Sequence, residues 1–167
     1  MRVRVANFSP SRSQQRCIKK NSDLEVRVIA PEEADHEKYY ALFAHYIETR
    51  HQDGDMYPPS REQFYAFLGS SISATLFLEF YQEEQLVMVA QSDRLSNGLS
   101  CVYTFFDTTE ESRGLGNFSI LKQIEISQTM GLDFVFLGYW VEDARKMSYK
   151  KKFKPNDVYI DGSWQRL

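Results

Sequence analysis

Hydrophobic and polar positions change their period several times along the first half of the chain. Residues 2–5 and 24–29 alternate apolar with charged side chains, which predicts two short strands. The polar, basic segment 11–20 is predicted to be helical. Apolar side chains three and four positions apart predict an amphipathic helix over 32–51. The sequence DGDMYPP breaks that helix, and Ser60 can cap the next one.

The second half is richer in strands. Three apolar stretches joined by short turns predict an antiparallel meander, followed by a helix, a buried strand, a short basic helix and a last strand. In chain order these segments are 75–81, 85–90, 100–106, 115–130, 134–137, 144–152 and 158–160. The order includes one βαβ crossover. It predicts an α/β (α+β) fold of the GNAT-like (acyl-CoA N-acyltransferase-like) kind, a mixed, mostly antiparallel sheet flanked by helices.

Composition narrows the class of protein. Hydrophobic residues make up 43% of the chain and charged residues 26%, the balance of a soluble globular domain. No apolar run approaches the roughly 20 residues that span a bilayer, and the N-terminus has no signal-peptide core. We therefore expect a cytoplasmic protein without a membrane partner. Cys17 and Cys101 are far apart and form no CxxC pair, which indicates reduced thiols and no metal site in this chain.

The net charge of −3 conceals two basic segments. Residues 1–20 and 145–154 each hold six Lys and Arg and no acid, whereas residues 21–144 hold 21 acidic against 7 basic side chains. Such a protein can dock a phosphate backbone along one side. Two solvated basic segments explain the same pattern, and charge alone slightly favours that interpretation.

Charged side chains gather in RHQDGDMYPPS (50–60), after the first long helix. Arg50 and His51 suit a carboxylate. Asp53 or Asp55 can hold an ammonium or accept a proton. From the residues alone, a helix stop with a solvated turn is the favoured interpretation.

A second candidate lies where the strand 100–106 leads into a helix. Asp107 follows the strand, and Arg113 opens the sequence RGLG. In acetyltransferase-like folds this turn presents backbone N–H groups to a phosphate, and glycine permits close approach. The match is short, and a glycine turn ahead of a helix is common.

Aromatic and basic residues are interleaved in the segment 137–155. Tyr139 and Trp140 follow a predicted strand, where a base or sugar can stack. Arg145 and the lysines after it suit phosphates. A basic helix lying over an aromatic core is the alternative, but the interleaving favours nucleic acid.

Together these segments resemble the bacterial branch of the arginyl-tRNA–protein transferase family, the aspartate/glutamate leucyltransferases. The matching strings are RVRVANFSPSRSQQRCIKKN (2–21), YIETRHQDGDMYPPS (46–60), SCVYTFFD (100–107), GLDFVFLGYWVEDARKMSYKKKFKP (131–155) and DGSW (161–164). They span essentially the whole chain. The resemblance implies transfer of leucine from leucyl-tRNA to proteins that begin with Asp or Glu, which marks them for N-degron degradation. The form RHQDGDMYPPS favours leucine over arginine.

The resemblance also locates candidate residues. Those expected to move the amine proton or stabilise the oxyanion are Asp107, Tyr103 and Asp53. Those expected to bind the acceptor's acidic side chain are Arg50, His51 and Arg113. Those expected to bind tRNA are Tyr139, Trp140, Lys146, Tyr149, Lys150 and Lys151. We expect a monomer with no cofactor of its own.

Family members carry a cysteine cluster ahead of the RVRV segment. We therefore interpret residues 1–23 as the remnant of that N-terminal region and residues 24–167 as the GNAT-like, aminoacyl-tRNA-dependent transferase domain. A cysteine-bound cluster is expected only in the region that is missing here. Three alternatives stay open: arginyl transfer, an inactive truncated module that binds tRNA or peptide, and an acyl-CoA-dependent N-acetyltransferase.

Overall fold

The computed structural model describes residues 1–68 and 74–167. Its strands are β1 (Arg2–Arg4), β2 (Leu24–Ile29), β3 (Ala74–Gln82), β4 (Gln85–Leu95), β5 (Gly98–Phe106), β6 (Phe134–Phe136), β7 (Asn156–Ile160) and β8 (Ser163–Arg166). Its helices are α1 (Arg12–Lys20), α2 (His36–Arg50), α3 (Arg61–Leu68) and α4 (Leu115–Thr129), with the 3-10 helices η1 (Pro31–Glu33), η2 (Thr108–Arg113) and η3 (Arg145–Lys152). Each segment that the sequence predicted is present, whereas β8 and η2 were not predicted.

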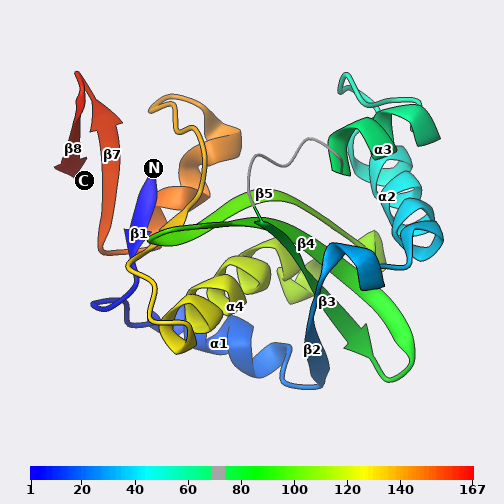
Figure 1. Cartoon of the computed structure of the whole chain (residues 1–167), viewed down its shortest axis with the longest axis horizontal. Helices are drawn as coiled ribbons and strands as arrows, with labels where there is room; N and C mark the ends of the chain where they lie inside the picture. The colour runs from blue at the N-terminus through cyan, green and yellow to red at the C-terminus, as the bar shows by residue number, and fades with distance from the viewer. Residues whose placement is uncertain (69–73) are drawn as a thin grey trace.

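The strands of the described chain form a single mixed sheet in the order β2-β3-β4-β5-β6-β1-β7-β8 (Figure 1). Neighbours are antiparallel except β5 and β6, which are parallel and joined through α4. The predicted α+β fold with a mostly antiparallel sheet and one βαβ crossover is confirmed.

Two predicted helices differ from the expectation. The helix predicted over 32–51 begins only at His36, because the carboxylate of Asp35 caps α2 by accepting a hydrogen bond from the N–H of Lys38 (3.2 Å). The basic helix predicted over 144–152 is the 3-10 helix η3. This helix is short, and it ends where the side chain of Phe153 is buried. Over so few residues, the tighter hydrogen bonds between positions i and i+3 can satisfy the backbone groups.

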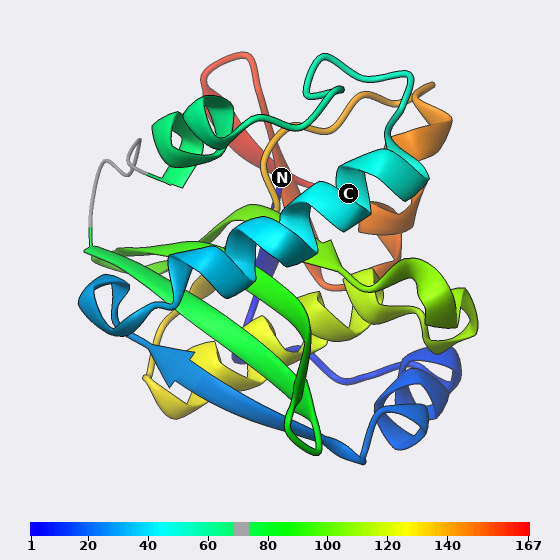
Figure 2. The same ribbon diagram turned by 90° about the vertical axis from the view of Figure 1, so that its right-hand side faces the viewer.

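Helices cover both faces of the sheet. Figures 1 and 2 show α2 and α3 on one face, with α4 and α1 on the other. Under α2 lies an aromatic core, in which the ring of Tyr39 is 5.2 Å from that of Phe77 and the ring of Phe43 is 5.2 Å from that of Phe64. Nearer the C-terminal end of α2, the ring of Tyr46 is 4.9 Å from that of Phe106 on β5, and this packing holds that end of the helix over the strand.

The N-terminal strand β1 lies inside the sheet, between β6 and β7. Val3 pairs with Val135 and is completely buried. Arg2 and Arg4 each place a guanidinium nitrogen 2.9 and 3.0 Å from the buried carboxylate of Asp157. Part of the first basic segment is therefore neutralised within the sheet. The division into 1–23 and 24–167 stays a prediction.

The parallel strands β5 and β6 are paired over three residues only, from Gly98 opposite Phe134 to Ser100 opposite Phe136. The approach is close at its start, because a side chain on Gly98 would lie 2.5 Å from the carbonyl oxygen of Phe134. Beyond this point β5 continues to Phe106, while the chain after β6 rises above the sheet (Figure 1). The place where the two strands part is called the strand gap below.

Candidate active site

Two segments that are distant in sequence meet over the strand gap. One is the loop that follows α2, and the other runs from the end of β6 into η3. The ammonium of Lys146 lies 3.4 Å from the carboxylate of Asp53, and the phenol of Tyr103 on β5 lies 3.6 Å from the sulfur of Met56. The structure thus brings together three of the predicted site residues, Asp53, Tyr103 and Lys146.

Three tyrosines line this region, namely Tyr46, Tyr103 and Tyr149. Burial, together with the nearby phenol of Tyr46, raises the pKa of Tyr103 to about 12. Burial likewise raises the pKa of Tyr46 and that of Tyr149. All three phenols therefore stay protonated near neutral pH and act as hydrogen-bond donors rather than bases. Tyr46 was missed by the sequence analysis, where its spacing on α2 indicated only a core position.

His51 ends α2 and faces the same tyrosines. Its Nε2 is 3.0 Å from the hydroxyl of Tyr46, and the two rings are 4.9 Å apart. Burial, followed by the positive charges of Arg50 and Lys146, lowers the pKa of His51 below its ordinary value. His51 is therefore neutral at pH 7, which favours a hydrogen-bonding role over an ionic grip on a carboxylate.

Lys150 is half-buried, and its ammonium points back to the protein. It donates hydrogen bonds to the carbonyl oxygens of Leu137 (2.7 Å) and Tyr139 (2.6 Å). The contacts tie η3 to the chain that leaves β6, and burial lowers the pKa of Lys150. Lys151, in contrast, lies over the ring of Trp140, 4.7 Å from its centroid. The geometry favours a positioning role for Lys150, leaving Lys151 and the exposed Lys146 as the lysines better placed for phosphates.

Asp107 lies at the other end of β5, away from this group. Its carboxylate accepts a hydrogen bond from the N–H of Thr109 (2.9 Å) and is 3.7 Å from Nε2 of His45. Asp107 is four positions beyond Tyr103 along the chain, roughly 13 Å in extended backbone. Arg50 is also on this side, with its guanidinium 3.4 Å from Glu111. The three predicted catalytic residues therefore do not form one constellation.

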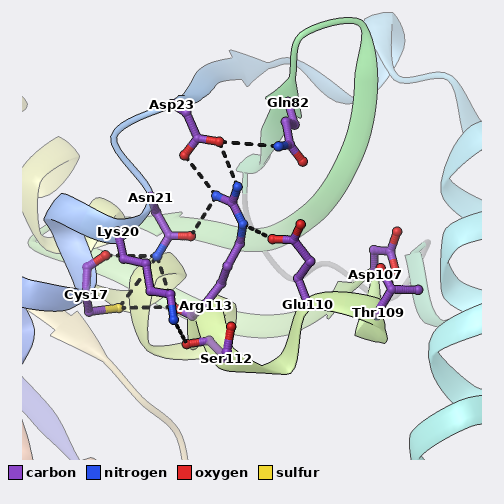
Figure 3. Close-up of polar contacts among 10 residues, drawn as sticks. All are labelled: Cys17, Lys20, Asn21, Asp23, Gln82, Asp107, Thr109, Glu110, Ser112 and Arg113. Carbon is purple, nitrogen blue, oxygen red and sulfur yellow. Dashed lines mark hydrogen bonds and ion pairs between the residues drawn. The ribbon is translucent and has the colours of Figure 1, made fainter.

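Arg113 is enclosed by acidic and polar partners (Figure 3). Its guanidinium donates to both oxygens of Asp23, at 2.9 and 2.7 Å, as well as to Glu110 and to the side-chain oxygen of Asn21. Pairing with Asp23 and Glu110 raises the pKa of Arg113 further, and Arg113 lowers that of Asp23. Arg113 thus ties η2 to the α1–β2 turn, and binding an acceptor's carboxylate would require displacing Asp23 or Glu110.

Tyr139 and Trp140 follow β6 and lie side by side in sequence but differ in environment. Tyr139 is 88% exposed. Trp140 is half-buried under Lys151. Both border a cavity beside the strand gap that also involves the β7–β8 hairpin. β8 was absent from the sequence prediction, so this cavity was missed.

Within residues 1–68 and 74–167, no group of three or more His, Cys, Asp or Glu is arranged to hold a metal ion. None of the helices in this described part is long and apolar enough to cross a membrane.

The strands of this sheet follow the order of N-acyltransferases, and its two parallel strands separate beside protonated phenols. These features define an acyltransferase-like class of fold. Solved structures share it: "The structure of L-PGS from Bacillus licheniformis" matches with a TM-score of 0.65 and 10% identity, over 99% of this chain and 56% of that one. The C-terminal domain of a putative lysylphosphatidylglycerol synthetase from Agrobacterium fabrum matches with a TM-score of 0.61 and 9% identity, over 89% and 48%.

Sequence comparison defines the family. The family model described as "Arginine-tRNA-protein transferase, C terminus" matches residues 38–160. Proteins named aspartate/glutamate leucyltransferase are 47% identical in Saccharophagus degradans, over 98% of this chain and 69% of that protein, and 47% identical in Pseudomonas fluorescens, over 98% and 68%. A protein of that name from Pseudomonas aeruginosa is 46% identical, over 99% and 70%. The chain therefore belongs to the arginine-tRNA–protein transferase family of aminoacyltransferases.

Proposed function

We propose that this chain transfers leucine from leucyl-tRNA to the α-amino group of proteins that begin with Asp or Glu. The choice of substrates rests on sequence identity: the chain is 46–47% identical, over nearly its whole length, to proteins named for that specificity. The strand gap supports the reaction class, because it gathers donors and a carboxylate around the half-buried middle of β5. We further propose that the protein works as a cytoplasmic monomer without a resident cofactor.

The reaction needs no covalent enzyme intermediate. The acceptor's α-ammonium loses a proton, and its lone pair attacks the ester carbonyl carbon that joins leucine to the terminal ribose. A C–N bond forms, the ester C–O bond breaks, and the ribose hydroxyl leaves with a proton. Since the ester is already activated, most of the acceleration comes from holding amine and ester together.

Tyr103 is the candidate donor to the developing oxyanion. Its phenol stays protonated at neutral pH, because burial raises the pKa of Tyr103 to about 12. A positioned neutral donor of this kind stabilises the charge that builds up in the transition state. Asp53 is exposed on the facing loop, where a carboxylate can hold the incoming ammonium and orient it for proton loss.

The tRNA side of the proposal rests on η3 and the residues before it. Lys146 and Lys151 present ammonium groups on the surface, and that of Lys151 lies over the ring of Trp140. Phosphate contacts position a nucleic acid without reading its sequence. Tyr149, which is part of η3, packs against the core, and this suits a supporting role.

Arginine is the second candidate donor, because the matching family model is named for arginine-tRNA. The test is to incubate the chain with labelled leucyl-tRNA or arginyl-tRNA and a peptide that begins with Asp, and to read the peptide mass. We expect a leucine-sized gain, with none on a matched peptide that begins with Ala. An arginine-sized gain alone would reverse the donor assignment, and a gain on both peptides would remove the acceptor specificity.

A further inference from the structure

The cavity beside the strand gap has aromatic walls and a volume of about 420 Å³. It is bordered by the end of β6, the segment that follows it and the β7–β8 hairpin. Its aromatic residues are Phe136, Tyr139, Trp140, Tyr159 and Trp164. The volume falls in the range of small-molecule sites, which are largely apolar and carry a few polar groups.

Several of these rings are exposed. Tyr139 is 88% exposed, Tyr159 60% and Trp164 37%. The ring of Trp164 lies 5.2 Å from that of Tyr159 and 6.0 Å from that of Phe136. Aromatic surface concentrated around a hollow indicates a site for a flat or apolar ligand.

Two charged side chains contact residues that form the walls of the cavity. The guanidinium of Arg2 lies 4.1 Å from the ring of Trp164, and Arg2 is itself fixed by the buried carboxylate of Asp157 at 2.9 Å. On the opposite side, Lys150 holds the carbonyl of Tyr139 at 2.6 Å. These contacts fix Trp164 and the backbone of Tyr139, which reduces the entropy that is lost when a ligand enters.

Positive charge adjoins the aromatic walls at one place. Lys151 lies in the last turn of the basic helix η3, and its ammonium is 4.7 Å from the ring of Trp140. Flat rings next to a cation match a nucleotide, since the base stacks and the phosphate meets the charge. A leucine side chain is apolar and would gain no favourable contact with this ammonium.

The cavity also lies next to the proposed reaction site. Ser100, the last residue of β5 that pairs with β6, lines it. Tyr103 is three positions further along the chain, roughly 10 Å away. A nucleoside with its base in the cavity would therefore lie close enough for its ribose to reach the neighbourhood of Tyr103.

We propose that this aromatic cavity binds the 3′-terminal adenosine of tRNA, with the base stacked on Tyr139, Tyr159 or Trp164 and the 5′-phosphate near Lys151. The choice of tRNA rests on the proposed function above. Tyr159 and Trp164, on the β7–β8 hairpin, thereby become substrate-binding residues.

Both tryptophans of the chain, Trp140 and Trp164, border the cavity. Intrinsic tryptophan fluorescence consequently reports on it directly, and adenosine 5′-monophosphate is the probe. We expect saturable quenching by this nucleotide, and neither leucine nor inorganic phosphate should reproduce it. Tyr159→Ala should weaken the affinity roughly tenfold, the loss of one stacking platform. Tyr65→Ala, which removes a tyrosine that is 41% exposed on α3, is the matched control and should leave it unchanged.

Quenching by leucine but not by the nucleotide would overturn the proposal, as would equal affinities of the Tyr159→Ala and Tyr65→Ala variants. Circular dichroism on each variant shows that the fold is retained. The binding test is independent of turnover. Nucleotide binding without leucine transfer would refute the proposed function and leave the cavity's assignment standing. Unchanged leucine transfer by Tyr159→Ala, with no nucleotide binding, would refute the cavity's assignment and leave the proposed function standing.

Discussion

The ammonium of Lys146 lies 3.4 Å from the carboxylate of Asp53, so two loops that are 93 positions apart in the sequence meet over the strand gap. Both side chains are largely exposed, at 86% and 75%. A surface ion pair contributes about 1 kcal/mol or less to stability. The contact is informative mainly for the geometry of the site, because it places the loop that follows α2 beside the segment that leads into η3.

Asp53→Asn should reduce leucine transfer to an Asp-leading peptide roughly tenfold or more, because it removes the carboxylate that orients the ammonium. Its free energy of unfolding should stay within about 1 kcal/mol of the wild type. Steady-state kinetics and urea denaturation measure the two quantities. Glu125→Gln, which breaks the exposed pair between Glu125 and Lys122 on α4, is the matched control. If both variants lose activity equally, Asp53 has no special role.

Tyr103→Phe should lower kcat by roughly 100-fold, the cost of one oxyanion donor, with little change in the acceptor's KM. Because burial raises the pKa of Tyr103 to about 12, its titration should leave no trace in the activity profile between pH 6 and 9. Tyr65→Phe is the control, since that phenol is exposed and hydrogen-bonds to Glu37 (3.2 Å). An alkaline rise in activity that disappears in Tyr103→Phe would instead make Tyr103 a base.

Lys150→Met and Lys151→Met should separate positioning from phosphate binding. Lys150→Met loses two hydrogen bonds from a charged donor to backbone carbonyls, so the free energy of unfolding should fall by about 2 kcal/mol. Lys151→Met should cost less than about 1 kcal/mol, but it should reduce the salt dependence of tRNA affinity by about one phosphate contact. A reduced salt slope in Lys150→Met would return Lys150 to the phosphate-binding set.

Arg113→Met should act on stability. It removes hydrogen bonds to Asp23, Glu110 and Asn21, and we expect a loss of about 1–2 kcal/mol in the free energy of unfolding. Asp23→Asn should reproduce part of that loss, and the double variant should lose less than the sum because the two residues share a contact. The KM for the acceptor peptide should not change. A large rise in that KM would restore Arg113 as an acceptor-binding residue.

His51 should make stability depend on pH below neutrality. Burial and neighbouring cations lower the pKa of His51, so the folded protein resists its protonation more than the unfolded chain does. The stability that neutral His51 contributes is complete above the ordinary pKa of about 6.5 and is lost as the pH falls toward the lowered value. The Tm of the wild type should therefore fall more steeply than that of His51→Gln between pH 7 and 5. Parallel curves would contradict the shift.

Much of the secondary structure was predictable from local pattern. The alternation in 24–29 and the spacing of Tyr39, Phe43 and Tyr46 predicted β2 and α2 correctly, because each pattern follows the geometry of a single element. Ser60 was correctly identified as a cap, since its hydroxyl accepts a hydrogen bond from the N–H of Gln63 (3.1 Å). The start of α2 was predicted too early, because residues 31–33 form the separate 3-10 helix η1 and Asp35, beyond them, caps α2.

What the sequence determined by itself was the order of elements, the kinds of side chain in each loop and the family. Only the tertiary structure decided which of those side chains meet. It placed Asp53 against Lys146 and Asp107 beside His45, and it paired Arg113 with Asp23 and Lys150 with backbone carbonyls. The physical reason is that helix and strand periods arise from neighbours along the chain. The partners of a charged side chain are set by the packing of elements that are distant in sequence.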